Sequence, residues 1–124
     1  MIRIKRAYDP PDPADGRRIL VDRVWPRGLT REALGIERWA RELAPSDDLR
    51  RWFGHDPARW EEFRRRYRIE LAAPEREAEL EELAAIARSE TLTLVYSARD
   101  EEHNQARVLA EVIAERVARR GSGS

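Results

Sequence analysis

Three segments of the chain have the hydrophobic pattern of β-strands. Residues 2–6 alternate apolar and basic side chains, which is typical of a strand with one buried face. Residues 18–24 and 91–97 are nearly continuous apolar runs, which favour central strands covered on both faces. We therefore expect the segments around Ile4, Val21 and Leu94 to be neighbouring strands of one sheet.

Most of the remaining chain has the period of amphipathic helices. We expect a short helix over residues 36–43, a helix capped by Ser46, a long helix opened by Asp56 and Pro57, and another that restarts at Pro74. The last helix should run over residues 103–119 and pack on the sheet through Val108, Leu109 and Val112. The aromatic and aliphatic side chains expected to be largely buried between helices and sheet are Trp39, Trp52, Trp60, Phe63 and Leu83.

Strands followed by helices, then a strand and a helix, predict an α/β fold in which helices cover a small sheet. A chain of 124 residues is one domain, which we place at residues 1–120. Residues 9–16 carry three prolines and a glycine, which predict a stiff surface loop without helix or strand. Residues 121–124 read Gly-Ser-Gly-Ser and resemble an appended linker.

Composition narrows the classes of function. Charged residues make up 39% of the chain, and the 24 basic and 24 acidic side chains cancel, whereas a generic nucleic-acid binder is lopsidedly basic. Lys5 is the only lysine; the arginine excess suits a GC-rich genome or a warm habitat, and some arginines could bind phosphate or carboxylate. The chain has no cysteine, which excludes disulfides, thiol nucleophiles and zinc ribbons and fits a reducing cytoplasm. No apolar run is long enough for a membrane span, so we expect a cytoplasmic protein.

Familiar catalytic motifs are absent, so the candidate site comes from polar residues that follow the expected strands. Ligands of open α/β sheets bind beyond the carboxyl ends of strands, and these residues would meet there if the strands are parallel. The candidate catalytic residues are Asp22 and His103. The candidate ligand-binding residues are Arg6, Tyr8, Arg23, Trp25, Arg27, Ser97, Arg99, Asp100 and Asn104.

Each candidate also has a structural interpretation. Asp22 could be a general base that orients His103, or it could hold Arg23 in a buried ion pair. Asp100 would most simply cap the last helix, whose first amides could instead hold an anion together with neighbouring side chains. Trp25 could be a hydrophobic plug or a stacking platform. His55 lies at a turn between helices, where packing is favoured over a site role.

A metal site is not expected. Asp22, Asp100 and His103 would make a set of two carboxylates and one imidazole, but the spacing Asp-x-x-His is common by chance. The sequence leaves the cofactor open.

Several longer motifs resemble the YeaO-like branch of the domain-of-unknown-function family 488. They are GRRILVDRVWPRG at residues 16–28, LRRWFGHD at residues 49–56 and LVYSA at residues 94–98 followed by His103-Asn104-Gln105. The resemblance implies a small bacterial or archaeal α/β domain with a mostly parallel sheet, and a biochemical function that is not established. Longer relatives carry cysteines near the positions of Ser97 and His103-Asn104-Gln105. This chain has neither, so the resemblance does not extend to their thiol or metal chemistry.

Three functions remain. The first is a pocket for a phosphate- or carboxylate-bearing small molecule, with or without hydrolytic or transfer chemistry. The second is a nucleic-acid-associated module in which Tyr8 and Trp25 stack bases, and the third is an interaction protein without catalysis. Whether the protein is an enzyme, and its oligomeric state, stay open at this point.

Overall fold

The computed structural model describes the backbone of residues 1–123 and the side chains of residues 1–119. Four strands and five α-helices lie within these residues. In chain order they are β1 (Ile2–Arg6), β2 (Arg17–Leu20), α1 (Arg31–Leu34), β3 (Arg38–Trp39), α2 (Asp47–Phe53), α3 (Trp60–Leu71), α4 (Glu77–Ser89), β4 (Leu92–Tyr96) and α5 (Gln105–Gly123). Short 3₁₀ turns lie at Pro13–Asp15, Arg41–Leu43, Pro57–Arg59 and Pro74–Arg76.

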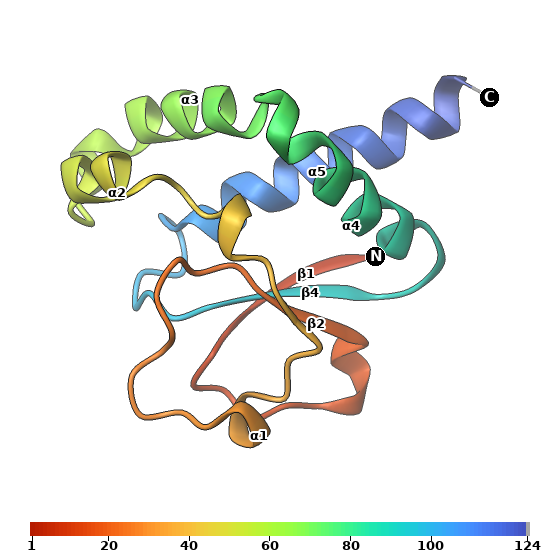
Figure 1. Cartoon of the computed structure of the whole chain (residues 1–124), viewed down its shortest axis with the longest axis horizontal. Helices are drawn as coiled ribbons and strands as arrows, with labels where there is room; N and C mark the ends of the chain where they lie inside the picture. Colours follow the sequence, from red (N-terminus) through yellow and green to blue (C-terminus); the bar gives the residue numbers. More distant parts are fainter. Residues whose placement is uncertain (124) are drawn as a thin grey trace.

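The strands form one parallel sheet in the order β1-β4-β2-β3. The central strand β4 pairs with β1 so that Tyr96 lies opposite Arg6, and with β2 so that Val95 lies opposite Leu20. The predicted α/β domain with three neighbouring strands and a parallel sheet is therefore confirmed. Because all strands run in one direction, their carboxyl ends lie together, at the left of Figure 1.

Long helices cover one face of the sheet (Figure 1). Leu92, Leu94 and Tyr96 alternate along β4 toward this face and belong to the larger core cluster. Helix α5 packs on β1 and β4, and α3 and α4 pack on α5. Val108 and Leu109 of α5 are fully buried, which confirms the predicted contact of the last helix with the sheet.

The opposite face of the sheet is covered by loops and by the short helix α1 (Figure 1). A smaller apolar cluster lies here, built on Leu20 of β2 and Val95 of β4 together with Ala7 and Leu34. Alternate residues of the same strands thus pack on two different layers, which explains why both strands read as nearly continuous apolar runs.

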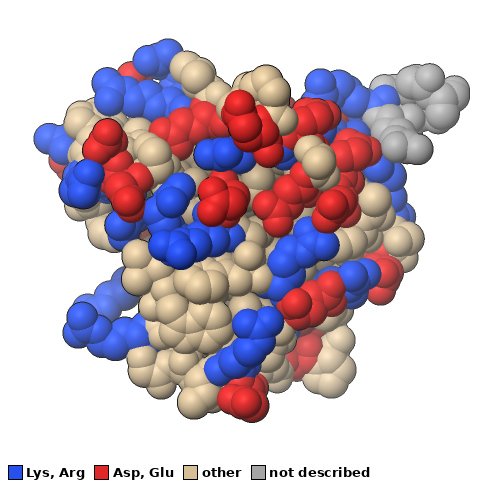
Figure 2. All heavy atoms as spheres, in the orientation of Figure 1, with Lys and Arg blue, Asp and Glu red and all other residues tan. Residues whose placement is uncertain are grey.

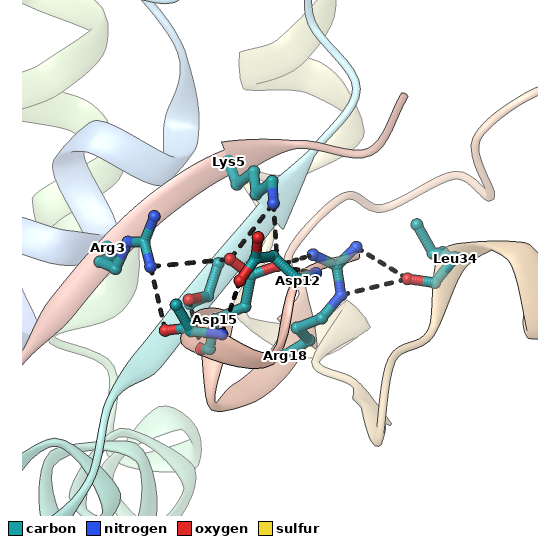
Figure 3. A network of polar contacts seen from close by, with 8 residues as sticks. Arg3, Lys5, Asp12, Asp15, Arg18 and Leu34 are labelled. Carbon is teal, nitrogen blue, oxygen red and sulfur yellow. Dashed lines mark hydrogen bonds and ion pairs between the residues drawn. The ribbon is translucent and has the colours of Figure 1, made fainter. Parts of the chain in front are cut away.

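The rest of this face is ionic and is organised by Asp15, whose side chain is completely buried. Lys5 of β1 donates to both Asp15 oxygens, and Arg18 of β2 donates to Asp15 Oδ2 at 2.7 Å (Figure 3). Burial alone would raise the pKa of Asp15, but the hydrogen bonds from Lys5, the Asp12 amide and Arg18 outweigh it and hold this pKa below its usual range. The network ties the 9–16 connection to two strands.

Three local predictions are wrong. Residues 36–43 are not a helix, because Gly35 ends α1 in the left-handed conformation and the Ala40 amide donates to the Leu20 carbonyl beside β3. The second strand ends at Leu20, and Val24, expected within it, is 56% exposed. The 9–16 loop contains a 3₁₀ turn whose amino end is capped by the Asp12 side chain.

The predicted aromatic core is only partly correct. Phe63 and Leu83 are buried, but Trp39, Trp52 and Trp60 are half-buried at the border of the core. Arginine guanidinium groups lie over two of the exposed indole faces, at 5.4 Å from the ring centre of Trp39 and 4.3 Å from that of Trp52. Cation–π contacts of this kind stabilise an aromatic ring that is not covered by the core.

Two further expectations concern the chain as a whole. Helix α5 is continuous to Gly123, and Ser124 lies outside the described residues, so the expected linker at residues 121–124 stays a prediction. Among the described helices, none combines the length and the apolar character needed to cross a membrane.

Candidate functional site

The carboxyl edge of the sheet carries two adjoining pockets of about 530 and 450 Å³. All eleven predicted site residues line one or both of them. The larger pocket is lined by Asp22, Arg23, Ser97, Arg99, Asp100, His103 and Asn104. The smaller takes Arg6, Tyr8, Trp25 and Arg27, together with Ser97 and Arg99, which lie between the two. This is a finding about placement, and the roles of these residues stay predictions.

Asp22 lies in the larger pocket and is 6% exposed. Its Oδ2 accepts hydrogen bonds from the Ser97 amide at 3.0 Å and the Ser97 hydroxyl at 2.5 Å, and its Oδ1 accepts one from Gln105 Nε2 at 2.5 Å. Burial raises the pKa of Asp22, and the hydrogen bonds from Ser97 and Gln105 only partly oppose this. The carboxyl group therefore joins the ends of β2 and β4 to the first turn of α5.

The predicted pairing of Asp22 with Arg23 or His103 is wrong. Arg23 Nε instead donates to the carbonyl of Pro45 at 3.0 Å, and His103 Nδ1 forms a hydrogen bond with Asp100 Oδ2 at 2.9 Å. Asp22 does not need a cation, because neutral donors from Ser97 and Gln105 already satisfy its oxygens.

Asp100 and His103 form a dyad at the edge of the larger pocket. Asp100 Oδ1 also accepts from the amides of Glu102 and His103, so this side chain caps the turn that precedes α5. The hydrogen bond from the His103 ring is the main reason that the pKa of Asp100 is lowered. The His103 ring meets Trp60 edge-on, with ring centres 5.3 Å apart, which holds the imidazole against α3.

The cap of the last helix is Asn104 and not Asp100, which corrects the sequence interpretation. Asn104 Oδ1 accepts from the Arg107 amide at 3.2 Å, and its Nδ2 donates to the Asp100 carbonyl at 2.9 Å. The side chain is 1% exposed, and both ends of its amide are engaged within the protein. Asn104 therefore stabilises the helix start.

In the smaller pocket, three predicted residues are held by backbone oxygens. Arg6 Nε donates to the Ala98 carbonyl at 3.0 Å, and the Tyr8 hydroxyl donates to the Arg27 carbonyl at 3.0 Å. Trp25 Nε1 donates to a carbonyl four residues further along the chain at 2.7 Å, and its ring packs edge-on against a second tryptophan. These contacts fix the shape of the smaller pocket and support the reading of Trp25 as a plug.

Arg27 and Arg99 differ from the other arginines of the site. Both are exposed, and neither guanidinium forms a hydrogen bond or an ion pair with any residue that the structure describes. Arg99 lines both pockets, whereas Arg27 lines only the smaller. A guanidinium without an internal partner keeps its donors available for an anion.

One wall of the larger pocket was missed by the sequence analysis. It comes from the corner between α2 and α3 and includes Arg50, Phe53, His55 and Phe63. The two phenylalanines stack with ring centres 4.3 Å apart. Phe63 was expected to be buried, which is correct, but helical periodicity did not reveal that the two rings also face a cavity.

The residues described here contain no group of three or more His, Cys, Asp or Glu side chains that could hold a metal ion. Asp22, Asp100 and His103, considered above as a possible ligand set, are accordingly engaged in separate hydrogen bonds.

Comparison with known proteins places the chain in a family. The family model described as "Inactive DUF488-N3 subclade", DUF488-N3i, matches residues 1–124. The chain belongs to the DUF488-N3i family. This confirms the resemblance to family 488 that the motifs had indicated.

The chain is also similar to uncharacterised proteins of two bacteria. The chain is 44% identical over 110 residues to "Uncharacterized protein YeaO" of Escherichia coli (strain K12), covering 89% of this chain and 94% of that protein. It is 38% identical over 112 residues to an uncharacterised protein of Mycobacterium tuberculosis (strain H37Rv), covering 90% and 92%. No solved structure gives a significant match. The YeaO-like assignment is therefore confirmed, and the function of this DUF488-N3i protein has to be argued from its site.

Proposed function

We propose that this protein binds a small anionic molecule in the larger pocket and does not transform it. The proposal rests on one observation: the same cavity has a mostly apolar wall and an arginine without an internal partner. The stacked rings of Phe53 and Phe63 supply the apolar wall, and Arg99 lies at the boundary with the smaller pocket. Such a cavity suits a ligand with an apolar or aromatic body and a phosphate or carboxylate.

The volume and charge of the pocket agree with this ligand. About 530 Å³ is within the range of small-molecule sites, roughly 300–1,000 Å³. Arg23 and Arg50 also line it, whereas the carboxylate of Asp22 is buried and that of Asp100 is paired with His103. Arg23 and Arg50 are also engaged, with the Pro45 carbonyl and with Asp47, so the charge left to meet a ligand is mainly the positive charge of Arg99.

Binding without catalysis is supported by how the reactive groups are used. Asp22 accepts three internal hydrogen bonds, and the His103 ring is bonded to Asp100 and packed on Trp60. The Ser97 hydroxyl donates to Asp22 within a network that joins strand ends and helix. The description of the family as inactive agrees with a site that holds a ligand without turnover.

A small molecule is favoured over nucleic acid by the distribution of charge. On the face shown in Figure 2, basic and acidic side chains alternate over the helical layer and do not form a positive stripe. Many arginines of the helical layer are paired, for example Arg64 with Glu111 and Arg68 with Glu115. We place the binding activity in the cytoplasm because a chain without cysteine suits a reducing compartment.

The test is a thermal-shift screen of nucleotides and of phosphorylated or carboxylated aromatic compounds, with benzyl alcohol as the uncharged control. A ligand at about 100 times its Kd adds about 2.7 kcal/mol and should raise the midpoint by roughly 10 °C in a domain of this size. Arg99→Ala should weaken binding about tenfold, because a charge-assisted hydrogen bond contributes about 1.5 kcal/mol.

Arg31→Ala is the matched control. Arg31 is also exposed and has no described side-chain partner, but it lies on α1 and lines neither pocket. It should bind as the wild type does. Equal losses in both variants, or no shift with any anion, would contradict the proposal.

A further inference from the structure

The corner between α2 and α3 is built from two consecutive residues in the left-handed conformation. Gly54 has φ 52° and His55 has φ 57°, and His55 is the only residue other than glycine with a positive φ within residues 1–123. Glycine adopts this conformation at no steric cost, whereas a side chain with a Cβ strains it. The turn by itself would therefore favour glycine at position 55.

The imidazole of His55 does little for the fold. The residue is exposed, and its ring makes one described contact, a tilted approach to Phe53 with ring centres 6.2 Å apart. It forms no hydrogen bond with any described group. Nothing in the packing explains why a strained position carries a histidine, but the side chain lines the larger pocket. Strained residues of this kind cluster at functional sites.

A second imidazole faces the same cavity from another element. The chain has two histidines, and both line the larger pocket, His55 from the α2–α3 corner and His103 from the turn before α5. His103 uses Nδ1 to bind Asp100, and its Nε2 has no described partner. Two imidazole rings and the Arg99 guanidinium thus offer donors from different walls of one pocket.

We propose that His55 is a ligand-binding residue that, with His103 and Arg99, contacts the oxyanion and makes the pocket selective for a phosphate monoester. This inference rests on the proposed function and assigns its ligand class. A planar carboxylate is satisfied along one edge by a single guanidinium, whereas a tetrahedral phosphate accepts hydrogen bonds from several directions. Donors on separate walls therefore match the phosphate better.

The surroundings of His55 favour an anion there. The charged and titratable groups that line this pocket on the elements around it are Arg50, Asp22, Arg23, Arg99, Asp100 and His103. Of the two carboxylates, Asp22 is satisfied by Ser97 and Gln105, and Asp100 is bonded to His103.

The first experiment compares wild type with His55→Gly and His55→Asn, using phenyl phosphate and benzoate as probes near pH 6.5. Both replacements tolerate the left-handed conformation, so the thermal midpoint without ligand should stay equal or rise. Affinity for phenyl phosphate should fall about three- to tenfold, and the preference of the wild type for phenyl phosphate over benzoate should shrink. If His55 served only the turn, affinity would be unchanged, and that result would overturn the inference.

The second experiment tests whether His55 recognises a tetrahedral oxyanion. Phenyl sulfate carries such a group and keeps one negative charge near pH 6.5. Both His55 variants should bind it more weakly than the wild type does, and equal affinity would overturn the role of His55.

The two proposals fail in different ways. If the wild type binds none of phenyl phosphate, phenyl sulfate and benzoate, the proposed function is contradicted and the role of His55 with it. If it binds benzoate alone, the proposed function stands and the role of His55 is overturned. If the wild type binds and Arg99→Ala weakens binding, but both His55 variants bind normally, only the role of His55 is overturned.

Discussion

Asp15→Asn tests whether the ionic network beneath the sheet stabilises the fold. The replacement keeps the size of the side chain and removes its charge. In the wild type, Asp15 is completely buried and accepts hydrogen bonds from Lys5, from Arg18 and from the Asp12 amide (Figure 3). In the variant, the asparagine amide nitrogen, which is a donor, would face donors that now bind a carboxylate oxygen of Asp15.

The expected loss follows from what remains around position 15. Removing one partner of a buried ion pair costs about 3–5 kcal/mol, because the other charge stays buried. The Arg18 side chain is 5% exposed and keeps two hydrogen bonds to the Leu34 carbonyl, whereas Lys5 is 18% exposed and can turn to water. We therefore expect a loss of stability at the low end of this range, about 3 kcal/mol. For an unfolding entropy of about 2 cal/mol/K per residue, the thermal midpoint should fall by roughly 12 °C.

Urea denaturation followed by circular dichroism at pH 7 measures this loss. The slope of the unfolding free energy against urea concentration should be unchanged, since the surface exposed on unfolding is the same. Glu37→Gln is the control, because it breaks an exposed ion pair. The Arg17 side chain is 35% exposed and the Glu37 side chain is 40% exposed, so this variant should move the urea midpoint far less. If Asp15→Asn shifted the urea midpoint as little as Glu37→Gln does, the reasoning would be refuted.

The pH dependence gives an independent check on Asp15. A carboxyl group whose pKa is lowered on folding stabilises the native state above its unfolded pKa, about 3.9. That stabilisation disappears as the pH falls through the lower folded value. The difference in stability between wild type and Asp15→Asn should therefore shrink below about pH 4. A difference that is constant down to pH 2 would contradict the ion-pair explanation.

Two further predictions concern the site and the core. Asp22→Asn should leave stability at pH 7 equal or higher, because the pKa of Asp22 is raised on folding and its charged form therefore destabilises the native state above about pH 3.9. The Gln105 amide can rotate to accept from the new nitrogen, while Ser97 still donates to the oxygen. A loss above about 2 kcal/mol in urea denaturation would contradict this prediction. Phe63→Ala should cost about 3–5 kcal/mol in the same assay, and Trp60→Ala clearly less because its indole is half-buried; equal losses would contradict the burial described here.

The fold was predictable where the pattern was long and local. Continuous apolar runs at β2 and β4 and the helical periods of α3, α4 and α5 identified the layers correctly. The two-residue strand β3 was missed because its backbone pairs with β2 only in the folded protein, and Ile36 and Ala40 are buried in a loop as they would be in a helix. The burial of Trp39 and Trp52 was overestimated because hydrophobicity alone ignores the arginines that lie over their rings.

The site was predictable to the level of elements but not of atoms. Parallel strands bring their carboxyl ends to one edge, which predicted that Arg6, Asp22 and Ser97 meet at one rim; in the structure they line two adjoining pockets at that edge. The partner of each side chain depends on distances of a few tenths of an ångström. The pairing of His103 with Asp100 could therefore not be predicted from the sequence. The α2–α3 wall depends on packing between distant segments.

The most direct test of the central claim is to map where an aromatic anion binds, by titrating the ¹⁵N-labelled protein with phenyl phosphate and following its amide resonances. The account predicts saturable shifts around the pocket, at the amides of residues 50–55 and 97–105, with the amides of α4 at the far end of the sheet unchanged. In Arg99→Ala the same shifts should need about ten times more ligand. Shifts centred on another surface, or no saturable shift at all, would contradict the claim that this cavity binds a small anion.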